Sequence, residues 1–293
     1  MKILITGSNG LLGQKIVALC VKYGYTFLAT SKGENRNPAC PAQQYFHLDI
    51  TNKLEINPIF EAFYPTHVIH TAAITNVDYC ELNQEQCEEV NIDATKYLFE
   101  TSQRFFAHFQ LLSTDFVFDG IKGNYSEEDS VNPLSYYAKS KVSAEKLLIE
   151  SNYKNWSIVR TIIVYGQGNN LSRSNMVLWV KDSLEKGQVI NVVDDQFRSP
   201  TWATDLAWGC LEILKQNKQG TYHLSGKDYL SMLEFAYQIA RYFKLDQSLI
   251  KQISSSNLNQ PAKRPPKTGF NINKAKADLG YNPKSIEESL GLI

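Results

Sequence analysis

The sequence predicts an α/β protein with a doubly wound parallel sheet and a smaller C-terminal α/β lobe. Two features predict the sheet: short apolar runs alternate with stretches of helical periodicity, and a glycine-rich turn follows the first run. A third feature, the change to helices separated by short strands after residue 165, predicts the lobe. We therefore expect residues 1–165 to form the sheet domain and residues 166–293 mainly the lobe, with the chain free to cross back between them.

The expected strands of the sheet are short runs of apolar and β-forming residues. They lie at residues 2–6, 25–30, 45–48, 67–70, 109–113 and 156–161. Apolar residues at helical spacing predict a helix from about residue 11 and further helices at 54–63, 85–104 and 136–150. Strands and helices that alternate in this way form right-handed βαβ units and therefore a parallel sheet.

The second part of the chain alternates helices with short strands. Its expected helices lie near 174–186, 202–215 and 231–243, and its strands at 189–193 and 221–224. Polar stretches with glycine or proline predict loops at 31–43, 120–135 and 254–269. We expect the lobe to cover the carboxyl edge of the sheet, where doubly wound folds bind ligands.

Composition excludes several classes of function. Thirty Lys and Arg residues balance thirty Asp and Glu residues, so the chain lacks the overall charge that attracts nucleic acid or an anionic membrane. Its apolar runs are too short to span a bilayer, and its N-terminus does not have the pattern of a secretory signal. The five cysteines lack CxxC or zinc-like spacing, which predicts reduced thiols, a cytoplasmic protein and no metal centre.

The first turn carries glycines three residues apart, between the first strand and the first helix. Gly7 permits a tight turn, Gly10 lets a pyrophosphate approach the backbone, and Gly13 permits close packing of helix on strand. The free N–H groups and the dipole of the helix then hold the anion. This turn predicts a Rossmann-type dinucleotide site, and chance placement of the glycines is the alternative. The expected cofactor contacts here are Gly7, Asn9, Gly10, Leu11, Leu12 and Gly13.

The GxxGxxG spacing resembles that of extended short-chain dehydrogenase/reductases, especially those that act on nucleotide sugars. NAD sites of this fold place an acidic residue at the end of the second strand, but here that strand ends in Ser31-Lys32, with Arg36 nearby. A hydroxyl and two cations suit a 2′-phosphate, so we expect NADPH, with NADH or a solvated loop as the alternatives. The resemblance also implies that Asp49 and Ile50 lie beside the adenine.

Tyr137 and Lys141 form a YxxxK pair at the start of an expected helix. Residues four apart share one helix face, so the ammonium of Lys141 can lower the pKa of the Tyr137 hydroxyl and hold the nicotinamide ribose. Tyr137 can then act as general acid toward a carbonyl while the nicotinamide delivers hydride. A YxxxK pattern is common by chance, but its place after the fifth strand is the one that this resemblance requires.

The end of the fifth strand reads Ser113-Thr114-Asp115-Phe116. The resemblance implies that the Thr114 hydroxyl hydrogen-bonds the substrate oxygen, and a strand-end cap is the alternative. Sugar-nucleotide 4,6-dehydratases typically follow this threonine with Asp-Glu, which supply the acid and the base for loss of water. Phe116 can supply neither, so the sequence favours reduction over dehydration.

Further stretches resemble the dTDP-4-dehydrorhamnose reductase family. They are residues 70–81, 90–91, 113–120, 195–201 and 262–265. The resemblance implies reduction of a dTDP-4-keto-6-deoxysugar at C4, which completes dTDP-L-rhamnose. The implied contacts are Ala72 and Ala73 for the cofactor, and Thr75, Val77, Asp78 and Asp115 for the substrate.

Two positions depart from the pattern of these reductases. Ile163 stands where they often have a tryptophan against the sugar, and Arg198 stands where they usually have glycine. A guanidinium in the cleft predicts a bidentate contact with a diphosphate or carboxylate of the substrate, and a surface arginine is the alternative. Arg264 is a second expected phosphate contact.

Two other functions are compatible with this branch of proteins. The β subunit of methionine adenosyltransferase resembles it and acts as a non-catalytic, regulatory binding partner. Sugar-nucleotide epimerases retain their cofactor and return the hydride. The intact set of Thr114, Tyr137 and Lys141 favours the reductase over the regulatory subunit. The resemblance also leads us to expect a homodimer, and we expect no metal to take part in the chemistry.

Overall fold

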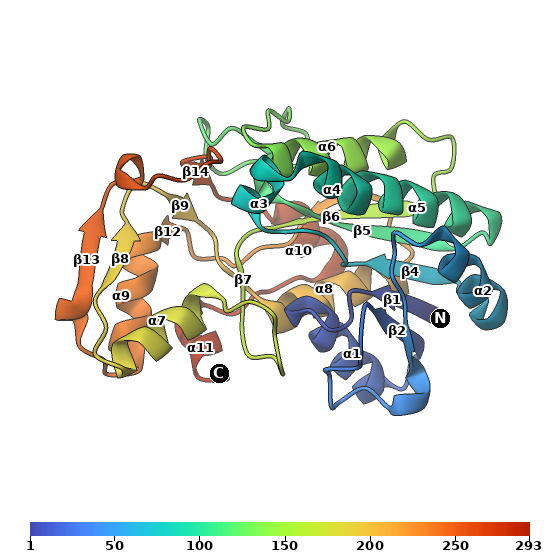
Figure 1. The fold of residues 1–293 in the computed structure, drawn as a ribbon, viewed down its shortest axis with the longest axis horizontal. Coiled ribbons are helices and arrows are strands. Elements are labelled where there is room, and N and C mark those ends of the chain that lie inside the picture. Colours follow the sequence, from blue (N-terminus) through green and yellow to red (C-terminus); the bar gives the residue numbers. More distant parts are fainter.

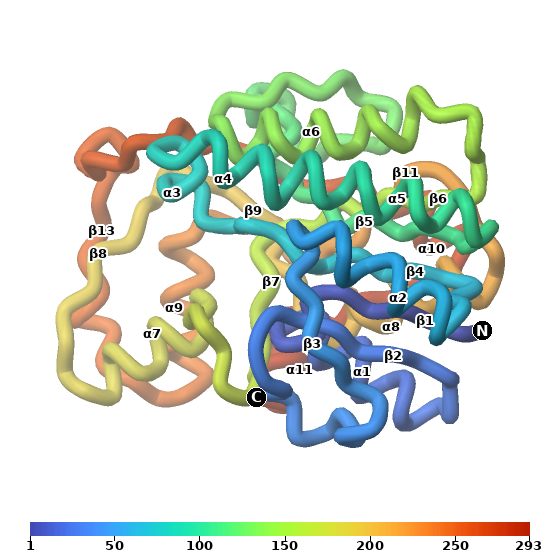
Figure 2. The backbone as a smooth tube through the Cα atoms, turned by 45° about the vertical axis from the view of Figure 1, so that its right-hand side comes forward, coloured from blue at the N-terminus to red at the C-terminus, as the bar shows by residue number.

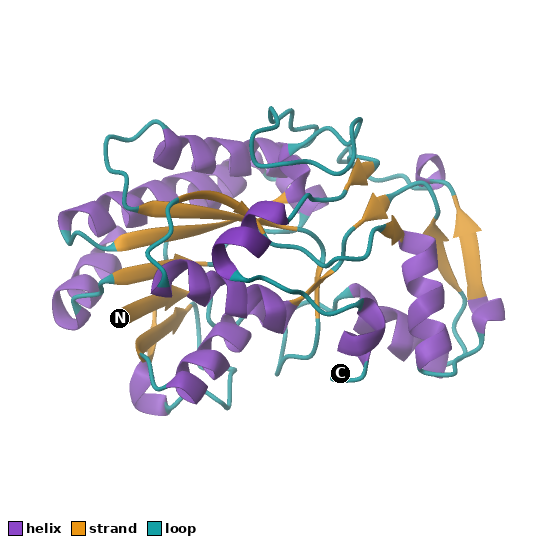
Figure 3. Cartoon of the chain, turned by 180° about the vertical axis from the view of Figure 1, so that it is seen from behind, coloured by secondary structure: helices purple, strands orange, loops and turns teal.

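The computed structural model describes residues 1–293 as a larger part built around one sheet and a smaller lobe beside it (Figure 1). The sheet and its covering helices lie on the right of Figure 1. The lobe lies on the left, and Figure 3 shows the same two parts from behind. None of the helices is both long enough and apolar enough to cross a membrane.

The central sheet has seven parallel strands in the order β11-β6-β5-β4-β1-β2-β3. Their bounds are β1 (Lys2–Thr6), β2 (Thr26–Ser31), β3 (Tyr45–His47), β4 (His67–His70), β5 (His108–Thr114), β6 (Trp156–Thr161) and β11 (Gly220–His223). The predicted doubly wound parallel sheet is therefore confirmed. The direction of winding reverses between β1 and β4, and ligands bind at the carboxyl ends of strands beside such a reversal.

Helices cover both faces of the sheet. On one face lie α1 (Leu11–Tyr23), α8 (Ala203–Lys215) and α10 (Asn273–Leu279), and on the other α2 (Lys53–Phe63), α5 (Ala94–Arg104) and α6 (Tyr136–Ile149). Successive strand residues point to opposite faces, which explains the two cores. Ile3 and Ile5 of β1 share a core with Ile16 of α1, whereas Leu4 shares the other core with Phe60 of α2.

The lobe has a separate core, to which Val180, Phe235 and Ile239 contribute. Its helices are α7 (Met176–Glu185), α9 (Met232–Tyr242) and α11 (Ile286–Leu290). Its longer strands, β8 (Ile190–Val193) and β13 (Ile250–Ile253), pair in parallel. Three two-residue strands form a small sheet between this core and the central sheet: β12 (Leu230–Ser231), β9 (Phe197–Arg198) and β14 (Lys267–Thr268) (Figure 1).

The chain returns from the lobe to the central sheet. After β7 (Val164–Tyr165), α7 and β10 (Thr201–Trp202), helix α8 packs into the same core as α1, and β11 then pairs with β6. Figure 2 shows β11 beside β6, at the end of the sheet far from β3. Residues 203–223 and α10 therefore complete the sheet domain, although they follow the first segments of the lobe.

The single helix predicted at 85–104 is divided in the structure. Helix α4 (Gln84–Glu88) is followed by a π-helical turn, η2 (Glu89–Asp93), and then by α5. Such turns insert one residue into a helix and are frequent at functional sites. Several further elements were not predicted, among them helix α3 (Val77–Leu82), the C-terminal helices α10 and α11, strand β13, and the two-residue strands, of which β14 lies within the expected loop at 254–269.

Candidate active site

A cavity of about 540 Å³ lies at the carboxyl ends of the central strands, against the start of the lobe. Four segments contribute to it: the glycine turn, the end of β5, the first turns of α6, and the loop that precedes α7. The expected site residues that line it are Gly7, Gly10, Leu11, Leu12, Gly13, Ala73, Thr75, Val77, Thr114, Asp115, Tyr137 and Lys141. The structure therefore brings the glycine turn and the YxxxK pair to one cavity.

Other expected site residues do not line this cavity. They are Asn9, Ser31, Lys32, Asp49, Ile50, Ala72, Asp78, Arg198 and Arg264. Most of them belong to three groups with different surroundings: the loop after β2, an ion pair on α3, and a buried ion pair beside the end of β5.

The glycine turn is so tight that side chains cannot be added at two of its three glycines. Gly7 has φ +72°, and a Cβ there would lie 2.6 Å from Thr71 Oγ1 and 2.7 Å from the backbone nitrogen of Ala72. A Cβ on Gly13 would lie 2.4 Å from the carbonyl oxygen of Gly7, whereas a Cβ on Gly10 would meet only that oxygen, at 3.3 Å. Gly10 is thus the glycine whose open side faces the cavity rather than the protein.

The start of α1 leaves its backbone donors available. Gly10 is its N-cap, so no side chain caps the helix, and its first turn contains no acidic residue. The first N–H groups of a helix have no partner within the helix, and the helix dipole adds partial positive charge there. This turn can therefore bind a phosphate group.

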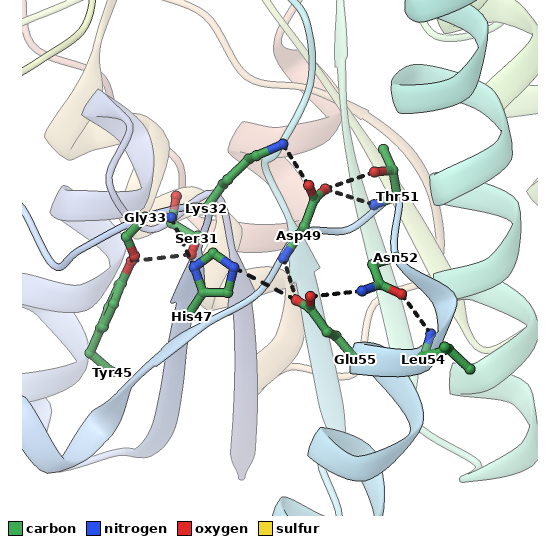
Figure 4. Close-up of polar contacts among 10 residues, drawn as sticks. All are labelled: Ser31, Lys32, Gly33, Tyr45, His47, Asp49, Thr51, Asn52, Leu54 and Glu55. Atoms are coloured by element: carbon green, nitrogen blue, oxygen red, sulfur yellow. Dashed lines mark hydrogen bonds and ion pairs between the residues drawn. The ribbon is translucent and has the colours of Figure 1, made fainter.

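The loop after β2 is held by hydrogen bonds to the glycine turn and to β3. The Asn9 amide donates to the carbonyl of Glu34 at 2.8 Å, and its oxygen accepts from the backbone N–H of Arg36 at 2.8 Å. The Tyr45 hydroxyl donates to the carbonyl of Gly33 at 2.7 Å (Figure 4). The side chain of Asn9 is buried among these contacts, so it shapes the loop.

Lys32 extends from this loop toward Asp49. Its Nζ lies 2.6 Å from Asp49 Oδ2, while 77% of its side chain is exposed (Figure 4). Burial opposes ionisation of Asp49, but hydrogen bonds from Lys32 and Thr51 outweigh that effect and lower its pKa. The structure therefore places an exposed cation at the end of β2, beside the glycine turn, and pairs it with the carboxylate expected near the adenine.

Thr114, Tyr137 and Lys141 all line the cavity. Thr114 ends β5, and Tyr137 and Lys141 occupy successive turns of α6, whose N-cap Ser135 accepts a hydrogen bond from Ala138. Burial raises the pKa of Tyr137 well above its usual range, although a hydrogen bond with Thr114 opposes this. Burial lowers the pKa of Lys141 to about 8, so the side chain is mostly protonated at neutral pH.

The neighbouring Tyr136 does not face the cavity. Its hydroxyl hydrogen-bonds the Glu88 carboxylate, and it does not line the cavity. Asn91, in the π-helical turn, fixes the wall behind the YxxxK pair. Its amide donates to the carbonyl of Ile74 and to Ser140 Oγ, both at 3.0 Å, and its oxygen accepts from the Ile74 N–H at 2.8 Å. Asn91 thereby ties α6 to the segment that follows β4.

Asp78 and Arg264, both expected to contact substrate, contact each other instead. Arg264 donates from Nη2 to Asp78 Oδ2 at 2.7 Å and from Nη1 to Oδ1 at 3.1 Å. The pair is partly exposed, and the hydrogen bonds from Arg264 lower the pKa of Asp78. This ion pair fastens the segment before β14 to α3.

Arg198 lies neither in the cleft, where we expected it, nor on the protein surface, which was the alternative. Its side chain is buried, with 1% exposure, and does not line the cavity. Nη2 donates to the carbonyl of Pro265 at 2.6 Å, and Nη1 donates to the carbonyl of Pro266 at 3.0 Å. The carboxylate that it meets is that of Asp115, 3.7 Å from Nε. The guanidinium turns inward because these carbonyls and this carboxylate satisfy its donors.

Comparison with known proteins places the chain in a family. The family model described as RmlD substrate binding domain matches residues 1–293. The chain belongs to this family. It is 32% identical to a dTDP-4-dehydrorhamnose reductase of Aggregatibacter actinomycetemcomitans, over 99% of this chain and 97% of that protein.

The chain is also similar to a solved reductase with bound NADP and to a subunit of methionine adenosyltransferase. A solved dTDP-4-dehydrorhamnose reductase of Bacillus anthracis, in complex with NADP, has a TM-score of 0.86 and 27% identity, over 99% of this chain and 97% of that one. The methionine adenosyltransferase 2 subunit beta of Bos taurus is 28% identical, over 87% of this chain and 76% of that protein.

The loop before α7 also contributes to the site, and this contribution was not predicted from the sequence. Residues 171–176 line the cavity, and Arg173 brings a positive charge to it. The loop is fastened to the first turn of α1, because the Gln14 side chain accepts from the Asn169 N–H and donates to the Asn169 carbonyl, both at 2.8 Å. The polar run Gly166-Gln-Gly-Asn-Asn after the sixth strand was a signal for such a loop.

Two further residues that line the cavity are unusual, one in its hydrogen bonding and one in its backbone conformation. Ser113 Oγ is buried without a hydrogen-bond partner, although buried hydroxyls nearly always have one. Ile163 has φ +25°, which is rare for a β-branched residue. Ser113 lies near the end of β5 and Ile163 between β6 and β7, and a bound ligand can use the free hydroxyl of Ser113. No group of three or more His, Cys, Asp or Glu side chains is placed to hold a metal ion.

Proposed function

We propose that this protein is an NADPH-dependent reductase of a nucleotide-linked 4-keto-6-deoxysugar, as its dTDP-4-dehydrorhamnose reductase relatives are named. One observation carries the proposal: Thr114, Tyr137 and Lys141 converge on the cavity that also contains the glycine turn. A proton donor and a dinucleotide site that share one cavity are what carbonyl reduction requires.

The residues of the cavity fit the cofactor. Gly10 leaves open space beside the free donors of α1, which suits the pyrophosphate. Lys32 and Ser31 at the end of β2 are the groups for the 2′-phosphate, and Lys141 is the group for the nicotinamide ribose. NADPH supplies a hydride when bound.

The side chains of this protein supply the proton and hold the carbonyl. Tyr137 donates its hydroxyl proton to the oxygen at C4, and the charge of Lys141 stabilises the phenolate that remains. Thr114 lines the same cavity, and in the proposed complex its hydroxyl donates to the same oxygen. All three are at least 92% buried, so bulk water does not compete strongly with these contacts.

Particular residues favour reduction over the competing functions. Phe116 lines the cavity where 4,6-dehydratases carry an acid, so loss of water lacks its catalyst. The intact catalytic set argues against a purely regulatory subunit like that of methionine adenosyltransferase. All five cysteines are buried free thiols, which supports a cytoplasmic setting. A homodimer stays a prediction from the resemblance.

The proposal is tested with purified protein, NADPH and a panel of nucleotide-linked 4-keto sugars, including dTDP-4-keto-6-deoxyglucose with its epimerase. We expect stoichiometric oxidation of NADPH with the dTDP sugar, measured by the loss of absorbance of the reduced nicotinamide. Tight NADPH binding without turnover on any sugar would instead support the regulatory subunit. Interconversion of sugars without net NADPH loss would support the epimerase.

Replacing Lys32 by alanine should weaken NADPH more than NADH, by about three- to tenfold, because a single exposed charge contact is lost. Dissociation constants for both cofactors, measured by fluorescence titration, check this. Lys22→Ala, an exposed lysine at the far end of α1, is the matched control and should change neither constant. Equal losses for NADPH and NADH in Lys32→Ala would show that Lys32 does not meet the 2′-phosphate.

A further inference from the structure

The buried ion pair of Arg198 and Asp115 lies directly behind the Thr114 hydroxyl. Arg198 comes from β9, and Asp115 follows β5, so the pair joins the small sheet beside the lobe to the catalytic edge of the central sheet. Both side chains are at most 3% exposed. Burial of two charges is costly unless further hydrogen bonds satisfy them. Here one of those hydrogen bonds comes from Thr114, a residue of the active site.

The Asp115 carboxylate connects the guanidinium to Thr114. One oxygen, Oδ1, accepts a hydrogen bond from Thr114 Oγ1 at 3.1 Å. The other, Oδ2, faces Arg198 Nε and accepts from the hydroxyl of Thr268 in β14. Because a hydroxyl has a single proton, Thr114 gives up this contact when it donates to the substrate carbonyl, so Asp115 sets the position from which that proton is donated.

The remaining capacity of the Thr114 oxygen is equally constrained. It accepts from the backbone N–H of Phe116 at 3.3 Å, so Asp115 and the backbone hold the Thr114 oxygen from two sides. An ionised Asp115 can only accept, and it therefore holds the Thr114 hydroxyl in one rotamer. A protonated Asp115 could donate to Thr114 instead and would release the Thr114 proton to point elsewhere.

We propose that Arg198 is a positioning residue, which holds the Asp115 carboxylate in place and thereby sets the rotamer from which the Thr114 hydroxyl meets the substrate oxygen. This inference rests on the proposed reductase function and deepens it. The residue acts through Asp115 and touches neither substrate nor cofactor. It also gives a role to the arginine that replaces the glycine usual in the resembling reductases.

The electrostatic surroundings agree with this arrangement. Burial raises the pKa of Asp115, and Arg198 is the largest influence that opposes the rise. The other titratable group that faces the pair from α6 is Tyr137, while Tyr229 and Arg264 act on Arg198 from the lobe side. Loss of the guanidinium should therefore shift Asp115 toward its protonated form, because its main stabilising charge is gone.

The test compares Arg198→Met, Asp115→Asn and the double variant with the wild type. Arg198→Met should lower kcat about ten- to a hundredfold with little change in KM, because it misdirects a catalytic hydrogen bond. The acidic limb of its kcat profile should move to higher pH, since Asp115 must still be ionised. The double variant should be no slower than Asp115→Asn, because both changes remove the same link.

The matched control is Gln196→Ala, which removes a hydrogen-bond partner of Arg198 Nη2 but leaves the contact with Asp115 intact. It should keep the kcat of the wild type. The inference is overturned if Arg198→Met lowers kcat no more than this control, or if the losses of the two single variants multiply in the double variant.

A measurement without turnover separates this inference from the reductase proposal. In denaturant unfolding, the stability deficit of Arg198→Met relative to wild type should grow as pH rises above the folded pKa of Asp115 in the wild type, which burial already places above that of an unfolded Asp. The sign follows because the higher folded pKa favours the protonated carboxyl, whose stabilising effect is lost with rising pH. The Asp115→Asn background should abolish this growth. A deficit independent of pH overturns the ion-pair role, whereas absence of turnover in the wild type overturns only the proposed function.

Discussion

Tyr137→Phe is expected to lower kcat by about 10²- to 10⁴-fold, the usual contribution of a general acid, while NADPH binds almost as in the wild type. The change removes one oxygen and keeps the ring, which packs against Phe116 and the buried thiols of Cys80 and Cys87. Because the hydroxyl is the proton donor in the proposed reaction, the loss should fall on kcat rather than on KM.

The measurement is steady-state oxidation of NADPH, combined with a fluorescence titration of the cofactor. Tyr136→Phe is the matched control, since its hydroxyl contacts Glu88 away from the cavity. That variant should keep near-normal turnover. If Tyr137→Phe also kept it, the proton would have to come from another group, and the assignment of Tyr137 would be wrong.

The sheet domain could be predicted because its strands are buried on both faces. Such strands appear in the sequence as continuous apolar runs, for example Ile3–Ile5 of β1, and they alternate with amphipathic helices. The partner of the last strand could not be predicted, because β11 pairs with β6 only after the chain has passed through part of the lobe. The two-residue strands were missed because runs this short leave no periodicity.

The local motifs of the site could also be predicted, while its ion pairs could not. Gly7 to Gly13 and Tyr137 to Lys141 each lie within a single turn or helix, so their spacing in sequence determines their spacing in space. Arg264 and Asp78 are 186 positions apart, and nothing near either residue indicates the other. A cation assigned to a ligand from sequence can therefore be neutralised by a distant carboxylate, as the structure shows for Arg264.

Gly10→Ala is expected to leave the fold intact but to weaken NADPH binding by more than about tenfold, equivalent to ~1.4 kcal/mol. The backbone of Gly10 is extended, with φ −76° and ψ 165°, which alanine adopts readily. The added Cβ would meet only the Gly7 carbonyl, at 3.3 Å. The cost to stability should therefore be about 1 kcal/mol or less, mainly from a poorer N-cap.

Gly13→Ala provides the contrast, because its Cβ would lie 2.4 Å from the Gly7 carbonyl oxygen and 2.7 Å from Ser8 Cα. Those are backbone atoms that cannot move without opening the turn, so this variant should lose stability as well as binding. Thermal unfolding and cofactor titration on both variants distinguish the two effects. If Gly10→Ala bound NADPH as tightly as the wild type, the pyrophosphate could not approach the backbone at this turn. The open space at Gly10 would then have no part in cofactor binding.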